Sequence, residues 1–157
     1  MITPTADLCD AHPDGVQVFA GAFHDYGGHA SFGGPAATLR VSEDWRPVLA
    51  ALDEPGHGRV LVVDTGGSVR RAVLGERLLT RAAERGWAGV IVNGAVRDTA
   101  MTRRIGAGLR ALAAVPMRGE SGDPGERDGT LTLAGATVAP GDEVWADEDG
   151  IVVLRRG

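Results

Sequence analysis

The chain has 157 residues and a formal net charge of −5, and 43% of its residues are hydrophobic. These values fit one globular domain over residues 1–157 and exclude a disordered chain. The negative charge argues against a nucleic-acid binder. Neither a secretion signal at Met1–Asp7 nor an apolar run of the roughly 20 residues that span a bilayer is visible. We therefore expect a cytoplasmic protein that binds neither nucleic acid nor membrane.

The basic residues of the chain are all arginines. Lysine and arginine together number 16, and none of them is lysine. A Schiff-base mechanism needs a lysine amine, so carbon–carbon bond chemistry in this chain would have to stabilise negative charge in another way. The single cysteine, Cys9, cannot form an internal disulfide, and the histidines lack the spacing of a zinc site.

The N-terminal third predicts short helices and strands in alternation. A helix is expected over Pro4–Ala11, with Thr3 as its N-cap and Pro4 at its first position. The segments Val16–Gly21 and Ala36–Val41 are β-like, and Trp45–Leu52 is expected to be helical.

The central segment has the clearest pattern. Arg59–Asp64 and Ala88–Asn93 are nearly continuous apolar runs, typical of strands that are covered on both faces. Glu76–Arg85 lies between them and predicts a helix that Gly86 ends. Apolar residues on one face of this helix are Leu78, Leu79, Ala82 and Ala83. The order strand, helix, strand predicts a right-handed βαβ unit with parallel strands.

The C-terminal third predicts mainly strands. Leu109–Val115 is strand-like, and Gly119–Gly129 is a polar loop. Four further short strands are expected between turn residues, over Thr130–Leu133, Thr137–Ala139, Glu143–Ala146 and Ile151–Leu154. The whole chain is therefore expected to be a mixed α/β domain with a substantial β portion.

The βαβ unit predicts where a ligand binds. The helix runs antiparallel to the strand that follows it, so its N-terminus at Gly75 should lie beside the end of the strand at Asn93. The loop Asp64–Ser68 ends the parallel strand and should meet them there. Ligands of open α/β sheets bind at this carboxyl edge.

Three features at this edge suit an anionic ligand. The first helical turn, Gly75, Glu76, Arg77 and Leu78, offers free backbone N–H groups for a carboxylate. Arg97 can bind a carboxylate or an enolate oxygen in a bidentate way. Asp98 is a hard oxygen ligand that suits Mg²⁺ or Mn²⁺.

Simpler interpretations stay open beside these. Arg97 and Asp98 can be solvated charges of a surface loop, and Glu76 can serve only as favourable charge in a first helical turn. The side chains of Arg70 and Arg71 can add positive charge near the site, but they are expected to face water. The run from Asp147 to Asp149 is expected to be a turn.

At these residues the sequence resembles the regulator of ribonuclease activity A (RraA-like) family, which includes the 4-hydroxy-4-methyl-2-oxoglutarate aldolases. The resemblance covers nearly the whole chain. Its segments are Thr5–Asp10, Gly27–Gly34, Gly58–Arg71, Gly86–Asp98, Pro140–Asp142 and Ala146–Val153. Met101 stands where aldolase members often carry a further acid.

The resemblance implies a swivelling β/β/α domain of the phosphohistidine-domain type, usually in homotrimeric rings. It implies a metal-dependent lyase that cleaves 4-hydroxy-4-methyl-2-oxoglutarate to pyruvate and also decarboxylates oxaloacetate. Pyruvate would bind to Gly75–Leu78 and Arg97, whereas Asp98 would hold Mg²⁺ or Mn²⁺, supported by Glu76 through water. Arg97 and the metal would stabilise the pyruvate enolate.

Two other functions are weighed against this one. The family name suggests a non-enzymatic regulator that binds and inhibits ribonuclease E or an associated helicase. The segment Val62–Gly67 suggests a cofactor-dependent methyltransferase or dehydrogenase, but it lacks the GxGxxG pattern.

Overall fold

The computed structural model describes residues 3–156 and contains a nine-stranded mixed sheet and a separate β8–β9 hairpin. The helices are α1 (Thr5–Ala11), α2 (Arg46–Leu52), α3 (Glu76–Glu84) and α4 (Thr99–Thr102). The strands are β1 (Val16–Val18), β2 (His24–Asp25), β3 (Phe32–Arg40), β4 (Val60–Asp64), β5 (Gly89–Val96), β6 (Gly108–Ala114), β7 (Glu126–Arg127), β8 (Leu131–Leu133), β9 (Ala136–Val138), β10 (Glu143–Asp147) and β11 (Gly150–Leu154). The predicted mixed α/β class is confirmed.

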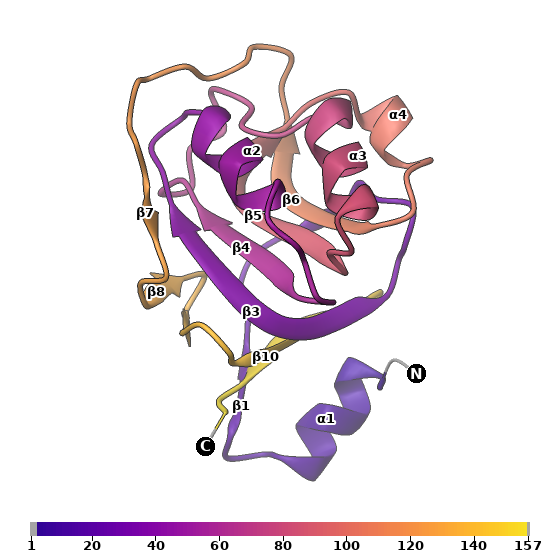
Figure 1. Ribbon diagram of the computed structural model, residues 1–157. Coiled ribbons are helices and arrows are strands. Elements are labelled where there is room, and N and C mark those ends of the chain that lie inside the picture. The colour runs from indigo at the N-terminus through magenta and orange to yellow at the C-terminus, as the bar shows by residue number, and fades with distance from the viewer. Residues whose placement is uncertain (1–2, 157) are drawn as a thin grey trace.

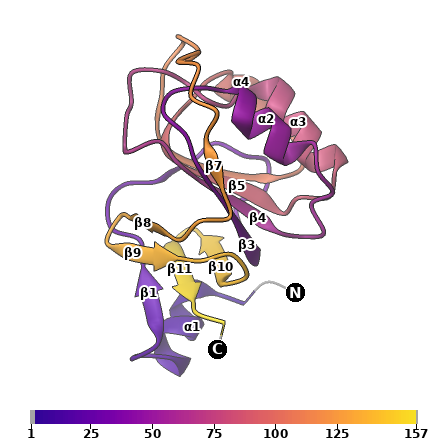
Figure 2. The ribbon, with the colours of Figure 1, turned by 60° about the vertical axis from the view of Figure 1, so that its left-hand side comes forward.

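The long strand β3 joins two differently built parts of the sheet. Its first half, Phe32–Pro35, pairs antiparallel with β10, which continues to β11 and β1. Its second half, Ala36–Arg40, pairs parallel with β4, which continues to β5 and β6. Helices α2 and α3 cover the parallel part, whereas α1 lies at the opposite, antiparallel end of the molecule (Figures 1 and 2).

Strand β4 is buried on both faces, as its apolar run predicts. Leu61 and Val63 pack into the hydrophobic cluster that includes the buried faces of α2 and α3. Val60 and Val62 pack into a second cluster with residues of β8–β11. Because side chains alternate along a strand, this single strand takes part in two cores.

The predicted βαβ unit is present. Strands β4 and β5 are parallel neighbours, in register from Val60 opposite Gly89 to Asp64 opposite Asn93. Helix α3 ends at Glu84, and Gly86 has a φ of 81° that favours glycine. Strand β5 continues beyond the predicted end at Asn93 as far as Val96, so Arg97 and Asp98 follow it directly.

The predicted N-cap of the first helix is wrong. Helix α1 begins at Thr5, and Pro4, not Thr3, occupies the N-cap position without a side-chain hydrogen bond. The backbone N–H and the hydroxyl of Thr5 instead donate to Asp147, each at 2.7 Å. A partner far along the chain therefore supplies the acceptor that Thr3 was expected to supply.

Other differences concern short elements. Strand β1 ends at Val18 rather than Gly21, and β2 and α4 were not predicted. The predicted loop Gly119–Gly129 contains the short strand β7, which pairs with β3. Within residues 3–156, no helix is long and apolar enough to cross a bilayer. The swivelling β/β/α description stays a prediction.

Asp44 fixes the loop that follows β6 against the start of α2. Its side chain is only 1% exposed and accepts hydrogen bonds from Arg46 and from the backbone N–H of Gly122. The backbone N–H of Trp45 donates to Gly119 at 3.1 Å in the same region. The pKa of Asp44 is lowered from 3.8 to about 2, mainly because the side chain of Arg46 donates hydrogen bonds to the carboxylate.

Asp44→Asn is expected to lower the free energy of unfolding at pH 7 by about 2 kcal/mol, the value that this pKa difference represents. The folded-state pKa is depressed, so the stabilisation is present above pH 3.8 and is lost as the pH falls towards about 2. The free energy of unfolding, measured with denaturant, should therefore change less with pH in Asp44→Asn than in wild type across this range.

The control is Asp10→Asn, which changes an exposed aspartate of α1. Equal pH profiles for wild type and Asp44→Asn would contradict this account of Asp44.

Candidate active site

The N-terminus of α3 and the segment after β5 are joined by hydrogen bonds. The backbone N–H of Glu76 donates to Asp98 Oδ2 at 3.1 Å, and the backbone N–H of Arg97 donates to the carbonyl of Leu74 at 2.9 Å. The structure therefore brings Glu76, Arg97 and Asp98 together at the carboxyl end of β5.

Asp98 adopts a left-handed backbone conformation that aims its carboxylate at α3. Its φ is 60° and its ψ is 36°, a region that aspartate tolerates better than most residues. Although Asp98 is the N-cap residue of α4, its side chain makes no capping hydrogen bond to that helix. The carboxylate instead lies at the positive end of α3, where the helix dipole favours an anion.

Gly75 is required by this close approach. A Cβ atom at this position would lie 2.5 Å from Asp98 Oδ2 and 3.2 Å from Arg97 Cγ. Its φ of −144° is open to any residue, so space, and not backbone conformation, demands glycine here. The next residues, Arg77 and Leu78, have backbone N–H groups in the first helical turn without acceptors inside the helix.

Two adjoining hollows surround these residues. The small hollow has a volume of about 60 Å³ and includes Gly75, Leu78 and Asp98 in its lining. The large hollow has a volume of about 750 Å³ and includes Arg70, Arg71 and Glu43. Arg97 and Arg118 line both hollows, so a single ligand can contact the two.

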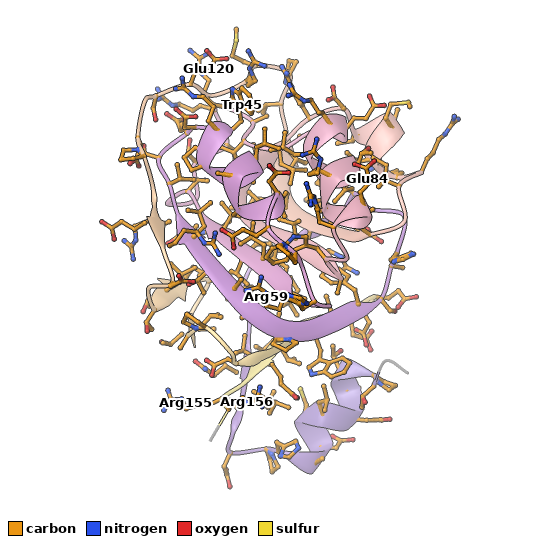
Figure 3. All side chains as sticks on the ribbon, in the orientation of Figure 1. Trp45, Arg59, Glu84, Glu120, Arg155 and Arg156 are labelled. Carbon is orange, nitrogen blue, oxygen red and sulfur yellow. The ribbon has the colours of Figure 1, made fainter. Side chains whose placement is uncertain are left out.

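Trp45 organises the arginines beside the small hollow. The guanidinium carbons of Arg118 and Arg77 lie 5.0 Å and 5.8 Å from the centre of its ring, within range of a cation–π interaction. Its indole N–H donates to Glu120 at 3.3 Å. Trp45 and Glu120 lie close together at the same end of the molecule in Figure 3.

Sequence reasoning missed Trp45, Arg118 and the role of Arg71 in lining the large hollow. A signal for Arg118 was present, because it follows β6 as Arg97 follows the neighbouring parallel strand β5. Arg71 is exposed to solvent, as expected, and it also lines the large hollow. Its neighbour Arg70 also lines this hollow, but it forms an ion pair with Glu43 at 2.9 Å.

The loop Asp64–Ser68 meets β5 but contributes to neither hollow. The backbone N–H of Gly67 donates to the carbonyl of Asn93 at 3.1 Å, and the side-chain amide of Asn93 donates to the carboxylate of Asp64 at 2.9 Å. Gly66 N–H donates to Asp64 Oδ1 at 2.9 Å. These backbone donors satisfy acceptors of the sheet edge and are not offered to a ligand.

The donor set suits a cation that keeps most of its water. Among residues 3–156, no group of three or more histidine, cysteine, aspartate or glutamate side chains is arranged to hold a metal. Asp98 and Glu76 are both exposed and belong to segments that touch. Mg²⁺ commonly binds through one or two carboxylates, with water and substrate oxygens as its other ligands, so this pair fits such an ion and not a closed protein cage.

Comparisons with known proteins agree on the family. The model of the RraA-like family, described as Aldolase/RraA, matches residues 5–153. A Deinococcus radiodurans protein with the provisional name 4-hydroxy-4-methyl-2-oxoglutarate aldolase is 52% identical over 151 residues, which are 96% of this chain and 94% of that protein.

Two solved structures are similar over nearly their whole length. One is described as the RNA-processing inhibitor RraA from Thermus thermophilis; it is 47% identical, with a TM-score of 0.93, and the match covers 98% of this chain and 93% of that chain. The other is described as S-adenosylmethionine: 2-dimethylmenaquinone methyltransferase from Geobacillus kaustophilus; it is 43% identical, with a TM-score of 0.95, and the match covers 99% and 96% of the two chains.

Gly75→Ala is expected to lower the free energy of unfolding by about 1–3 kcal/mol, because the added methyl group forces Asp98 away from α3. In an Asp98→Gly background the carboxylate that the methyl group would meet is absent. Gly75→Ala should therefore lower the free energy of unfolding by less than half as much. Denaturant unfolding of the four proteins gives the coupling between the two positions.

Gly129→Ala is the matched control, since a Cβ atom at Gly129 meets nothing within 4 Å. If Gly75→Ala costs the same with and without the Asp98 side chain, the contact does not explain the glycine.

Proposed function

The chain belongs to the RraA-like family, and we propose that it is a lyase that cleaves 4-hydroxy-4-methyl-2-oxoglutarate into two molecules of pyruvate with the help of a divalent metal. The observation that supports this best is the meeting of Arg97, Asp98 and the first turn of α3 in one small hollow. This arrangement combines an anion-binding helix end, a guanidinium group and a hard oxygen ligand.

The pyruvate half of the substrate would bind in the small hollow. Its carboxylate accepts hydrogen bonds from the backbone N–H groups of Arg77 and Leu78, which α3 leaves without partners. Its keto oxygen faces the guanidinium group of Arg97. Arg97 is half-buried, and its Nη1 donates to the carbonyl of Pro116 at 3.3 Å, which restrains the side chain.

The reaction is a retro-aldol cleavage. The C4 hydroxyl group loses its proton, the C3–C4 bond breaks, and C4 becomes the keto carbon of the first pyruvate. The electron pair of the broken bond moves through C3 and C2 onto the keto oxygen, and protonation of C3 then gives the second pyruvate. Arg97 stabilises the negative charge that develops on the keto oxygen, so it acts mainly in the transition state.

Asp98 would hold the metal, Mg²⁺ or Mn²⁺, and Glu76 would support it through water. When bound, the cation supplies further positive charge beside the keto oxygen. This route needs no lysine, in agreement with a chain that has none.

Oxaloacetate decarboxylation is the accompanying activity that we propose. The C3–C4 bond of oxaloacetate breaks, C4 departs as carbon dioxide, and the electron pair of that bond moves through C3 and C2 onto the keto oxygen. Arg97 therefore stabilises an identical enolate, and the two reactions differ only in the group that departs.

A second candidate function is the inhibition of an RNA-processing ribonuclease. It is favoured by the likeness to the Thermus structure described as an inhibitor of RNA processing. This regulator would not use the carboxylate of Asp98. Binding of ribonuclease E, measured by interferometry, should therefore survive Asp98→Asn, and no binding by either protein would count against this candidate.

A methyl-transfer function has weaker support here, although one similar structure is described as a methyltransferase. The glycine-rich loop after β4 uses the N–H groups of Gly66 and Gly67 within the sheet edge. Calorimetry with S-adenosylmethionine tests this candidate, and the absence of heat would remove it.

The proposed lyase should release pyruvate from 4-hydroxy-4-methyl-2-oxoglutarate and from oxaloacetate in a coupled assay with Mg²⁺. Chelator should abolish both activities, and Asp98→Asn should reduce kcat/KM by about 100-fold or more, because a transition-state charge loses its support. Turnover that survives both the chelator and the substitution would reject the mechanism.

Asp128→Asn is the control. Asp128 also has a left-handed backbone, with a φ of 65°, and it lines neither hollow. Full activity of this variant would show that replacing an aspartate with a left-handed backbone does not by itself abolish activity. The loss of activity in Asp98→Asn would then be specific to Asp98.

A further inference from the structure

We propose that Arg71 and Arg118 form a subsite for a second carboxylate, and that this subsite selects dicarboxylic 2-oxo acids. The inference rests on the proposed function, because it places the 2-oxo acid end of the substrate in the small hollow. It adds the residues that recognise the opposite end of the molecule.

Backbone pairing places the two arginines beside Arg97. The N–H of Ala72 donates to the carbonyl of Met117 at 2.7 Å, and the N–H of Gly119 donates to the carbonyl of Ala72 at 2.9 Å. On its other side, Ala72 forms a parallel bridge with Ala95 of β5. The segments that carry Arg71, Arg97 and Arg118 therefore lie side by side at one edge of the sheet.

The large hollow has an excess of positive charge. Four guanidinium groups line it, against the two carboxylates of Glu43 and Glu120. Glu43 pairs with Arg70, and Glu120 pairs with Arg118. Among the described residues, neither Arg71 nor Arg97 has a carboxylate within ion-pair distance. An anionic ligand group would balance this charge.

Arg118 is suited to contact a ligand that reaches across both hollows. It lines the two, and Trp45 holds its guanidinium group 5.0 Å from the centre of the indole ring. Its ion pair with Glu120 is solvent-exposed, with side chains 42% and 47% accessible. Exposed pairs of this kind contribute little, so Arg118 can exchange Glu120 for a ligand carboxylate at small cost.

In this proposal the arginines contact different parts of the substrate. Arg97 faces the keto oxygen at the junction of the hollows, and Arg71 and Arg118 receive the carboxylate at the other end of the carbon chain. A carboxylate between two guanidinium groups accepts charge-assisted hydrogen bonds. A 2-oxo acid with an apolar end would forgo these bonds and leave the large hollow with its excess positive charge.

Binding of 2-oxoglutarate and 2-oxopentanoate tests the subsite, because the two molecules differ only in the distal carboxylate. Calorimetry with Mg²⁺ present should show that wild type binds 2-oxoglutarate about 10-fold to 100-fold more tightly. Arg71→Gln should remove most of this preference and leave the affinity for 2-oxopentanoate unchanged. Arg118→Gln should weaken the binding of 2-oxoglutarate more than that of 2-oxopentanoate, because Arg118 lines both hollows. Equal affinities of wild type for the two ligands would overturn the proposal.

Arg85→Gln is the matched control, because Arg85 is the C-cap residue of α3, at the opposite end of that helix from the site. It removes one positive charge and should keep the full preference for 2-oxoglutarate. A loss of preference in this variant equal to that in Arg71→Gln would show an effect of net charge alone and overturn the subsite.

This experiment separates the two proposals. A preference for 2-oxoglutarate that depends on Arg71 and Arg118, in a protein that cleaves no 4-hydroxy-4-methyl-2-oxoglutarate, would support the subsite and reject the lyase. Cleavage of 4-hydroxy-4-methyl-2-oxoglutarate by a protein that binds both ligands equally would support the lyase and reject the subsite.

Discussion

The hydrogen bond from the backbone N–H of Glu76 to the carboxylate of Asp98 ties the start of α3 to the end of β5. It requires a left-handed residue at Asp98 and a glycine at position 75, because any side chain there would displace the carboxylate. The same contact places a carboxylate, a guanidinium group and free N–H groups within one small hollow. The chemistry proposed for the chain therefore depends on one close approach between a helix and a strand.

The rest of the fold keeps these two elements in place. Strand β4 and its parallel neighbours are buried on both faces, so the sheet that carries Arg97 and Asp98 packs against two hydrophobic clusters. Asp44 holds the loop after β6 against the start of α2, which positions the wall of the large hollow. Rigid elements thus present charged groups that themselves remain accessible to a ligand, an arrangement that suits precise positioning of a small substrate.

The sequence predicted best what depends on local pattern. The apolar runs of β4 and β5 and the amphipathic α3 were predictable because burial of a strand or a helix face leaves a direct trace in residue order. The meeting of the start of α3 with the end of β5 followed from chain direction, whereas the function of the residues gathered there stays a prediction. Interactions between distant segments left no such trace: Thr5 finds its acceptor in Asp147, 142 positions away, and Arg71 reaches the hollow only because Ala72 pairs with Ala95 and Arg118.

The family groups proteins described as an aldolase and as an inhibitor of RNA processing, so chemistry at the site has to decide between them. The most direct measurement is a crystal structure of this protein soaked with Mn²⁺ and oxalate, an analogue of the pyruvate enolate. The account predicts an anomalous scattering peak beside the carboxylate of Asp98, with oxalate between that peak, Arg97 and the N–H groups of Arg77 and Leu78. Manganese bound elsewhere, or an oxalate that does not contact Arg97, would contradict it.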